Sequence, residues 1–127
     1  MMGVEQLTFL EPVDEKLVRK IVIKELKEYR ALKVQVENKE ECEHAGLELF
    51  PSIRNSYHIN ELKVKQIDRA LKNSLDQEEL LIIEKAYLTS KRTKDIEIYL
   101  EIGLKKDTYY AMRNRALNRI ATALGII

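Results

Sequence analysis

Hydrophobic residues recur at helical spacing along almost the whole chain, and the first stripe is the longest. Apolar side chains follow one another at steps of three and four, which predicts a single helix ending near Lys39. Asp14 stands at the expected N-cap, with Val13 and Val18 as its hydrophobic staple. The stripe consists of Val18, Val22, Leu26, Tyr29, Leu32 and Val36, and is expected to be widened by Leu17 and Ile21. Such a face must be covered by other parts of the molecule or by a second copy.

The helical pattern breaks between residues 44 and 58, where Gly46, Pro51 and small polar residues predict a connector. Order is expected to resume at Asn60, a second predicted N-cap. Apolar residues at helical spacing follow it, namely Val64, Ile67 and Leu71. This pattern predicts a second helix.

A third helix is predicted at Asp76, because Asp76 and Glu79 have the spacing of a capping box. Its buried face is expected to consist of Leu80, Ile83 and Tyr87. Thr93 then follows a polar break and is the expected cap of a fourth, short helix.

The last quarter of the chain has the pattern of a helix-turn-helix. A short apolar-periodic segment ends at Gly103, and a longer segment rich in cations runs from about Lys106 to Leu124, with Gly125 as its C′ residue. A glycine suits such a turn because it accepts positive φ. We therefore expect an all-α fold: a lead-in and long helix in residues 1–43, a connector in 44–58, and a four-helix C-terminal domain in 59–127.

Charge is distributed unevenly, although the net charge of the 127 residues is only +1. The segment from Gly103 to Ile127 contains five cations and one anion, Asp107. It therefore carries a net charge of +4, and the rest of the chain carries −3. The five cations are Lys105, Lys106, Arg113, Arg115 and Arg119. Cations gathered on one helix either attract a phosphate backbone or form an ordinary solvated face.

The predicted last helix has two distinct faces. The face expected to be buried carries Tyr109, Met112, Ala116, Ile120, Ala123 and Ile127. The opposite face carries Asp107, Ala111, Asn114 and Asn118, flanked by Tyr110 and Arg115. Asparagine can bond adenine and alanine can touch a thymine methyl group, so this outer face is the candidate reader of DNA bases.

The leading end of that helix is expected to approach DNA most deeply, through Lys105, Lys106 and Thr108. A second set is expected to contact phosphates: Thr93, Lys94, Arg113 and Asn118. Arg113 lies near the apolar boundary, so it either extends along the core or reaches a phosphate. Tyr110 either bonds a phosphate or packs beside Leu117, whereas Arg119 is expected to be structural.

The C-terminal residues resemble the ArpU family of phage and prophage regulators of Gram-positive bacteria. The residues that match in register are Glu97-Ile98-Tyr99, Gly103, Thr108-Tyr109-Tyr110, Arg113, Ala116-Leu117, Ala121, Ala123 and Leu124. Upstream, the matching segments are Leu7-Thr8-Phe9-Leu10, Val13-Asp14-Glu15-Lys16 and Lys27-Glu28-Tyr29-Arg30. Lys105 replaces a serine of that pattern, Ile102 replaces a leucine, and Asp107 adds an anion at the helix tip. The resemblance implies a domain like region 4 of sigma-70 factors and activation of late phage genes.

Other chemistry finds little support in the sequence. Cys42, His44 and His58 are too few for a four-ligand zinc site, and no glycine-rich phosphate loop is present. We expect no enzyme, no metal and no cofactor. No apolar run is long enough to span a membrane, and a single cysteine favours the reducing cytoplasm of a bacterial host.

The expected function is sequence-specific duplex binding by a transcriptional regulator of phage or prophage genes that acts with host RNA polymerase. Two alternatives stay open: a DNA-packaging protein of the small-terminase type, and a protein-interaction module that does not bind DNA. The N-terminal helix is expected to cover its apolar stripe either on the C-terminal domain or in a homodimer.

Overall fold

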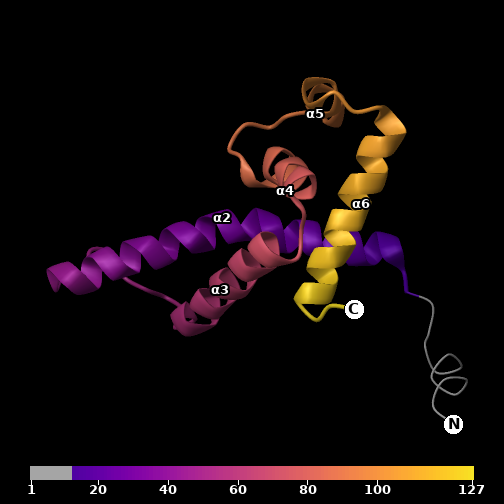
Figure 1. Cartoon of the computed structure of the whole chain (residues 1–127). Coiled ribbons are helices and arrows are strands. Elements are labelled where there is room, and N and C mark those ends of the chain that lie inside the picture. Colours follow the sequence, from indigo (N-terminus) through magenta and orange to yellow (C-terminus); the bar gives the residue numbers. More distant parts are fainter. Residues whose placement is uncertain (1–12) are drawn as a thin grey trace, which may run out of the picture.

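The structure is a computed structural model that describes residues 13–127, and all regular elements in that range are helical (Figure 1). In chain order they are α2 (Glu15–Ala45), α3 (Tyr57–Asn73), α4 (Gln77–Ile83), the π-helical turn η1 (Glu84–Leu88), α5 (Asp95–Ile102) and α6 (Lys106–Ala123). The predicted lead-in, with its Leu7-Thr8-Phe9-Leu10 segment, lies outside the described residues. The all-α prediction is confirmed for residues 13–127.

Helix α2 begins where the sequence predicts but extends further. Asp14 is its N-cap, and Asp14 Oδ1 accepts a hydrogen bond of 3.1 Å from the backbone N–H of Leu17. The helix continues past Lys39 to Ala45 and ends at Gly46, whose φ of 67° lets the backbone leave the helix. The connector therefore spans 46–56 rather than 44–58.

The buried face of α2 is narrower than predicted. Val18, Val22, Leu26 and Tyr29 are buried, as expected. Leu17 and Ile21 instead remain 53% and 38% exposed. The prediction that they widen the covered stripe is wrong, because the neighbouring helices pack against only one line of side chains on α2.

The start of α3 differs from the prediction. The helix begins at Tyr57 after Ser56, so Asn60 lies inside the helix and is not its N-cap. The reason is that the Asn60 N–H already bonds the Ser56 carbonyl oxygen at 3.0 Å, as in a helix interior. The Asn60 amide donates instead to Gln35 Oε1 on α2, at 2.9 Å. The predicted core positions of this helix, Val64, Ile67 and Leu71, are buried.

The capping box at the start of α4 is confirmed. Asp76 Oδ1 accepts from the Glu79 N–H at 2.9 Å, and Glu79 Oε1 accepts from the Asp76 N–H at 3.0 Å. Of the predicted buried face, Ile83 is fully buried, whereas Leu80 and Tyr87 are half-buried beside it. The position at which α4 begins is thus predictable from a local signal in the sequence.

The turn between α5 and α6 is built around Gly103, whose φ is 83°. The N–H groups of Gly103 and Leu104 both bond the Tyr99 carbonyl oxygen, at 3.0 and 2.9 Å. Thr93 does not cap α5, contrary to the prediction, because the helix starts one residue later and Lys94 takes the N-cap position without a side-chain bond. At the other end, Gly125 has the predicted positive φ, 75°.

Two clusters of buried side chains hold these helices together. The larger cluster combines α2, α3, Ile83 and the second half of α6, which contributes Ala116, Leu117, Ile120 and Ala121. The smaller cluster consists of Ile82, Ile98 and Tyr109, and it joins α4, α5 and the first half of α6. Helix α2 therefore shares one core with the C-terminal helices and also extends well beyond them (Figure 1).

Candidate nucleic-acid interface

Helix α6 turns a somewhat different face inward than the sequence predicts. Tyr109, Ala116 and Ile120 are fully buried as expected, but so are Leu117 and Ala121. Ala123 and Ile127 were predicted to be buried but are exposed, so the prediction is wrong at these two positions. The cause is that α6 packs against both α2 and α3, which cover a flank that periodicity alone assigns to solvent.

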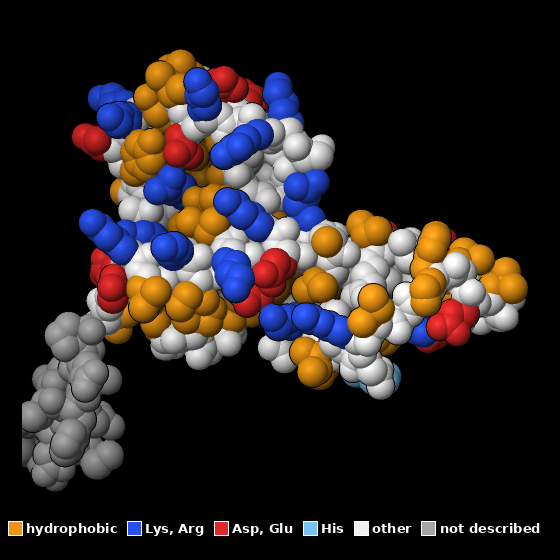
Figure 2. Space-filling model, turned by 180° about the vertical axis from the view of Figure 1, so that it is seen from behind, with side chains coloured by type: hydrophobic (Ala, Val, Ile, Leu, Met, Phe, Trp, Pro, Cys, Tyr) orange, Lys and Arg blue, Asp and Glu red, His pale blue; other side chains and the backbone are white. Residues whose placement is uncertain are grey.

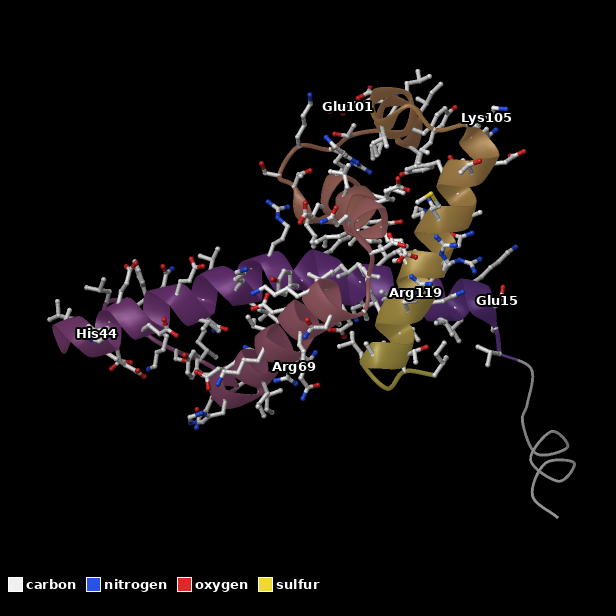
Figure 3. The ribbon with its side chains drawn as sticks, in the orientation of Figure 1. Glu15, His44, Arg69, Glu101, Lys105 and Arg119 are labelled. Atoms are coloured by element: carbon white, nitrogen blue, oxygen red, sulfur yellow. The ribbon has the colours of Figure 1, made fainter. Side chains whose placement is uncertain are left out.

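The leading end of α6 is open to solvent. Lys105 occupies the N-cap position, and Lys106, Asp107 and Thr108 form the exposed first turn. Neither lysine forms an ion pair with any side chain in residues 13–127. Figure 3 shows Lys105 at this end of α6 and Arg119 further along the helix. First-turn N–H groups and two unpaired lysines make this end attractive to phosphate.

Asp95, the first residue of α5, ties α5 to α6. Its Oδ1 accepts from the Tyr109 hydroxyl at 2.7 Å, and its Oδ2 pairs with Arg113 Nη1 at 3.2 Å. The Arg113 guanidinium also lies 4.8 Å above the centre of the Tyr110 ring. Burial and the Asp95 carboxylate raise the pKa of Tyr109 well above its usual range. Arg113 and Tyr109 thus connect α6 to α5, and Tyr110 packs beneath the Arg113 guanidinium.

A buried carboxylate pairs with two further cations of α6. Glu79 is completely buried, and its Oε2 accepts from Arg115 Nε at 2.9 Å while its Oε1 accepts from Arg119 Nη1 at 2.5 Å. Asp76 lies 3.8 Å from the same Arg119 guanidinium. Arg115 keeps 52% of its side chain exposed, although one of its donors is engaged. From the sequence Glu79 is recognisable only as a capping residue, because the arginines that it holds lie 36 and 40 residues away.

The predicted base-reading face of α6 is not covered by other helices. An open groove of about 630 Å³ runs beside it, lined by Ser74, Ala111, Asn114, Arg115, Asn118, Arg119, Thr122 and Ala123. Ala111 is exposed, and Asn114 and Asn118 are half-buried. Asn114 Oδ1 accepts a long bond of 3.4 Å from Arg113 Nη2, which leaves the Asn114 amino group without a partner in the described part of the chain. The structure thus gathers Ala111, Asn114, Arg115 and Asn118 at one accessible surface.

Exposed cations also precede α5, in the loop that follows η1. Lys91, Arg92 and Lys94 are exposed there, whereas Thr93 is half-buried and its hydroxyl bonds the Lys91 carbonyl oxygen at 3.5 Å. Figure 2 shows Lys and Arg side chains spread over this upper part of the molecule, interspersed with acidic ones. Sequence analysis missed Lys91 and Arg92, which it treated only as a polar break.

Other kinds of site have no support in residues 13–127. That range contains no group of three or more His, Cys, Asp or Glu side chains arranged to hold a metal ion. None of its helices combines the length and apolarity that crossing a membrane requires. No family model, no curated protein and no solved structure matches this chain.

Proposed function

We propose that the chain binds duplex DNA through α5 and α6, arranged as a helix-turn-helix with α6 in the major groove. The observation that carries this proposal is the division of α6. Its inner face is fixed in two apolar clusters, while the face with Ala111, Asn114 and Asn118 borders an open groove. A recognition helix needs this combination of a rigid back and an accessible front.

The proposed DNA contacts fall into two groups, those to phosphates and those to bases. Lys105 and Lys106, with the cations before α5, bind phosphates and set the position of α6 on the duplex. Asn114 reads adenine through its amide, and Ala111 contacts a thymine methyl group. Arg115 is held by Glu79 through Nε, which orients the guanidinium and leaves its Nη donors for a guanine or a phosphate.

The regulatory part of the proposal is supported by the ArpU resemblance of the segment from Glu97 to Leu124. In this view the protein directs host RNA polymerase to phage or prophage promoters, in the bacterial cytoplasm. Ile96 and Leu100 on the outer side of α5 are 51% and 68% exposed, one helical turn apart. They offer the apolar contact that a bound protein such as the polymerase would need.

Fluorescence anisotropy with labelled duplexes tests the proposal, after footprinting across neighbouring phage promoters has supplied a cognate site. Wild-type binding should weaken steeply as salt rises. Asn114→Ala should cost roughly 1–3 kcal/mol on the cognate site and relax sequence preference. Asn38→Ala, on the exposed part of α2, is the matched control and should change neither.

Two results would contradict the proposal. Equal loss on cognate and random duplexes would remove Asn114 from base reading. No binding to any duplex at low salt would favour a protein-interaction module instead. Ring-shaped assemblies in solution would favour the small-terminase alternative over a regulator.

A further inference from the structure

The end of α2 and the start of α3 form an arm that projects from the body of the molecule. We define the distal arm as residues 34–62, which include the connector 46–56 (Figure 1). The last buried residue of α2 is Tyr29, so the remaining turns of this helix contribute nothing fully buried to the core. Leu32 and Val36 are half-buried against the larger cluster, and beyond Val36 the helix has no further side chain packed against it.

The distal arm exposes an unusual amount of apolar surface. Ile53 is 99% exposed and Phe50 is 83% exposed. The other members are Leu49 at 64%, Ile59 at 62%, Leu47 at 59%, Leu62 at 56% and Val34 at 53%. Figure 2 shows hydrophobic side chains along the arm. Soluble monomers rarely leave such a patch uncovered, so this surface has the character of an interface.

The acidic charge of the distal arm is complementary to the basic charge of the rest of α3. The outer part of α2 and the adjoining connector expose five anions and two cations, Lys39 and Arg54; the anions are Glu37, Glu40, Glu41, Glu43 and Glu48. The outer side of α3 exposes Lys65, Arg69 and Lys72, and the last two form no ion pair within residues 13–127. An acidic tip and a basic helix on one surface can pair with their counterparts in a second copy.

The path of the chain places these two regions suitably for a two-fold axis. α2 runs outward to the acidic tip, and α3 returns from Tyr57 towards the body, with Ile59 and Leu62 near its outer end and Arg69 nearer the body. A two-fold axis close to Ile59 and Leu62 brings the acidic tip of each copy over α3 of the other. Such an arrangement is isologous and closes on itself.

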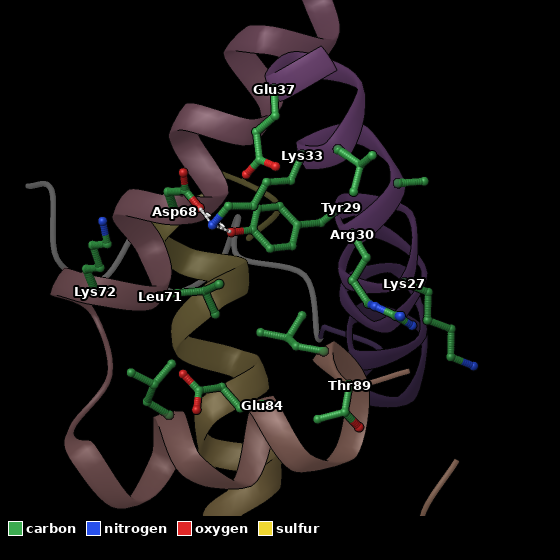
Figure 4. Close-up of a pocket in the computed structure, with 14 residues that line it drawn as sticks. Lys27, Tyr29, Arg30, Lys33, Glu37, Asp68, Leu71, Lys72, Glu84 and Thr89 are labelled. Atoms are coloured by element: carbon green, nitrogen blue, oxygen red, sulfur yellow. Dashed lines mark hydrogen bonds and ion pairs between the residues drawn. The ribbon is translucent and has the colours of Figure 1, made fainter. Parts of the chain in front are cut away.

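The base of the arm is held rigidly. The Tyr29 hydroxyl bonds the Asp68 carboxylate, and Lys33 Nζ lies 3.6 Å from the same carboxylate, beside a pocket of about 890 Å³ (Figure 4). Lys63 on α3 pairs with Glu25 on α2 at 3.3 Å. The angle between α2 and α3 is thus fixed before any association, which lowers the entropic cost of binding.

We propose that the protein forms a two-fold homodimer through the distal arm. Its centre consists of the exposed apolar residues of the connector and of early α3, and its edges pair the acidic end of α2 with Arg69 and Lys72 of the second copy. This arrangement differs from a pairing along the whole N-terminal helix, since the inner half of α2 belongs to the core of its own body.

Sedimentation equilibrium on the full chain without DNA tests the dimer. Wild type should sediment as a dimer, and Leu62→Glu and Phe50→Asp should each weaken association roughly tenfold or more. Both side chains are exposed, so circular dichroism should show an unchanged helix content. Leu100→Glu is the matched control, because the exposure of Leu100 lies between those of Leu62 and Phe50 but the residue is on α5; this variant should remain dimeric.

Charge exchange tests the pairing at the edges. Glu40→Lys with Glu43→Lys should weaken the dimer at low salt, and adding Arg69→Glu with Lys72→Glu should restore it. The proposal would be overturned if the wild type were monomeric or formed rings of several copies. It would also be overturned if Leu62→Glu left the dimer unaffected, or if the variant with all four charge reversals did not dimerise again. Since no DNA is present, its failure would leave the proposed DNA binding untouched.

Discussion

The two halves of α6 differ in how they are held and in what they show to solvent. The second half places Ala116, Leu117, Ile120 and Ala121 in the larger cluster, and its two arginines both pair with Glu79. The first half is anchored by a single fully buried residue, Tyr109, in the smaller cluster. Its two lysines at the leading end have no acidic partner in residues 13–127.

This difference shows that one half of a helix can fix it in the core while the other half exposes side chains to a ligand. The positive charge of the C-terminal segment overstates what a ligand would meet, because Arg113, Arg115 and Arg119 are already paired inside the molecule. The charge available to a phosphate lies at the N-terminal end of α6, in the loop before α5 and on the free Nη groups of Arg115. Variants in the two halves should therefore affect different quantities.

The largest effect is expected in the anchoring half. Ile120→Ala removes a fully buried side chain from the larger cluster and should lower the free energy of unfolding by about 2–5 kcal/mol. Met112→Ala, in the presenting half, removes a half-buried side chain and should cost clearly less. Urea denaturation followed by circular dichroism measures the stability of both variants. Equal losses of stability would contradict the proposed difference between the two halves of α6.

Glu79→Gln should cause the second-largest loss of stability. Glutamine can still accept the capping bond from the Asp76 N–H, but it loses the charge that pairs with both arginines, and the change should cost roughly 1–3 kcal/mol of stability. It should also strengthen binding to random duplex at low salt, because the variant removes a negative charge beside Arg115 and Arg119. Glu78→Gln removes the same charge from the exposed neighbour and is the matched control. If both variants bind random duplex equally, Glu79 does not restrain the arginines.

Tyr109→Phe should have a smaller effect on stability, about 0.5–1.5 kcal/mol, because only the bond to Asp95 is lost. Burial and Asp95 raise the pKa of Tyr109 above its ordinary value of 10.0, so the contribution of this hydroxyl is fully present below that pH. It should disappear as the pH rises through the raised pKa. Tyr99→Phe is the control, and urea denaturation at neutral and alkaline pH provides the measurement.

The smallest effect is expected from Lys106→Ala. It should leave stability nearly unchanged, weaken all duplexes alike, and reduce the slope of log affinity against log salt by about one. Lys24→Ala, at an exposed position of α2, should leave that slope unchanged. An unaltered slope for Lys106→Ala would place the phosphate contacts elsewhere.

Local signals in the sequence predicted the helices more reliably than their boundaries. Asp14 and the Asp76–Glu79 box were identified because a capping residue acts on its own helix within one turn. Asn60 and Thr93 were misassigned as caps because their residue types suit that role, but packing decided where each helix begins. Gly103 and Gly125 were identified because positive φ favours glycine.

The candidate site was predictable only in outline. Spacing placed Ala111, Asn114 and Asn118 on one side of α6, and the structure keeps that side accessible. The pairing of Glu79 with Arg115 spans 36 residues, so no local pattern could reveal it. The same holds for Asp95 and Arg113, which meet only because Gly103 folds α6 back against α5.

Helix α2 contains neither proline nor glycine between Glu15 and Ala45, and its inner part lies against α6 while its outer part carries the arm. Two copies joined at their arms would thus hold their two α6 helices at a fixed distance from each other. The dimer would have no hinge that could adjust this distance to a different DNA site. Operator half-sites would then need one fixed separation. Inserting about 5 base pairs between them would turn the second half-site to the opposite side of the duplex, beyond reach.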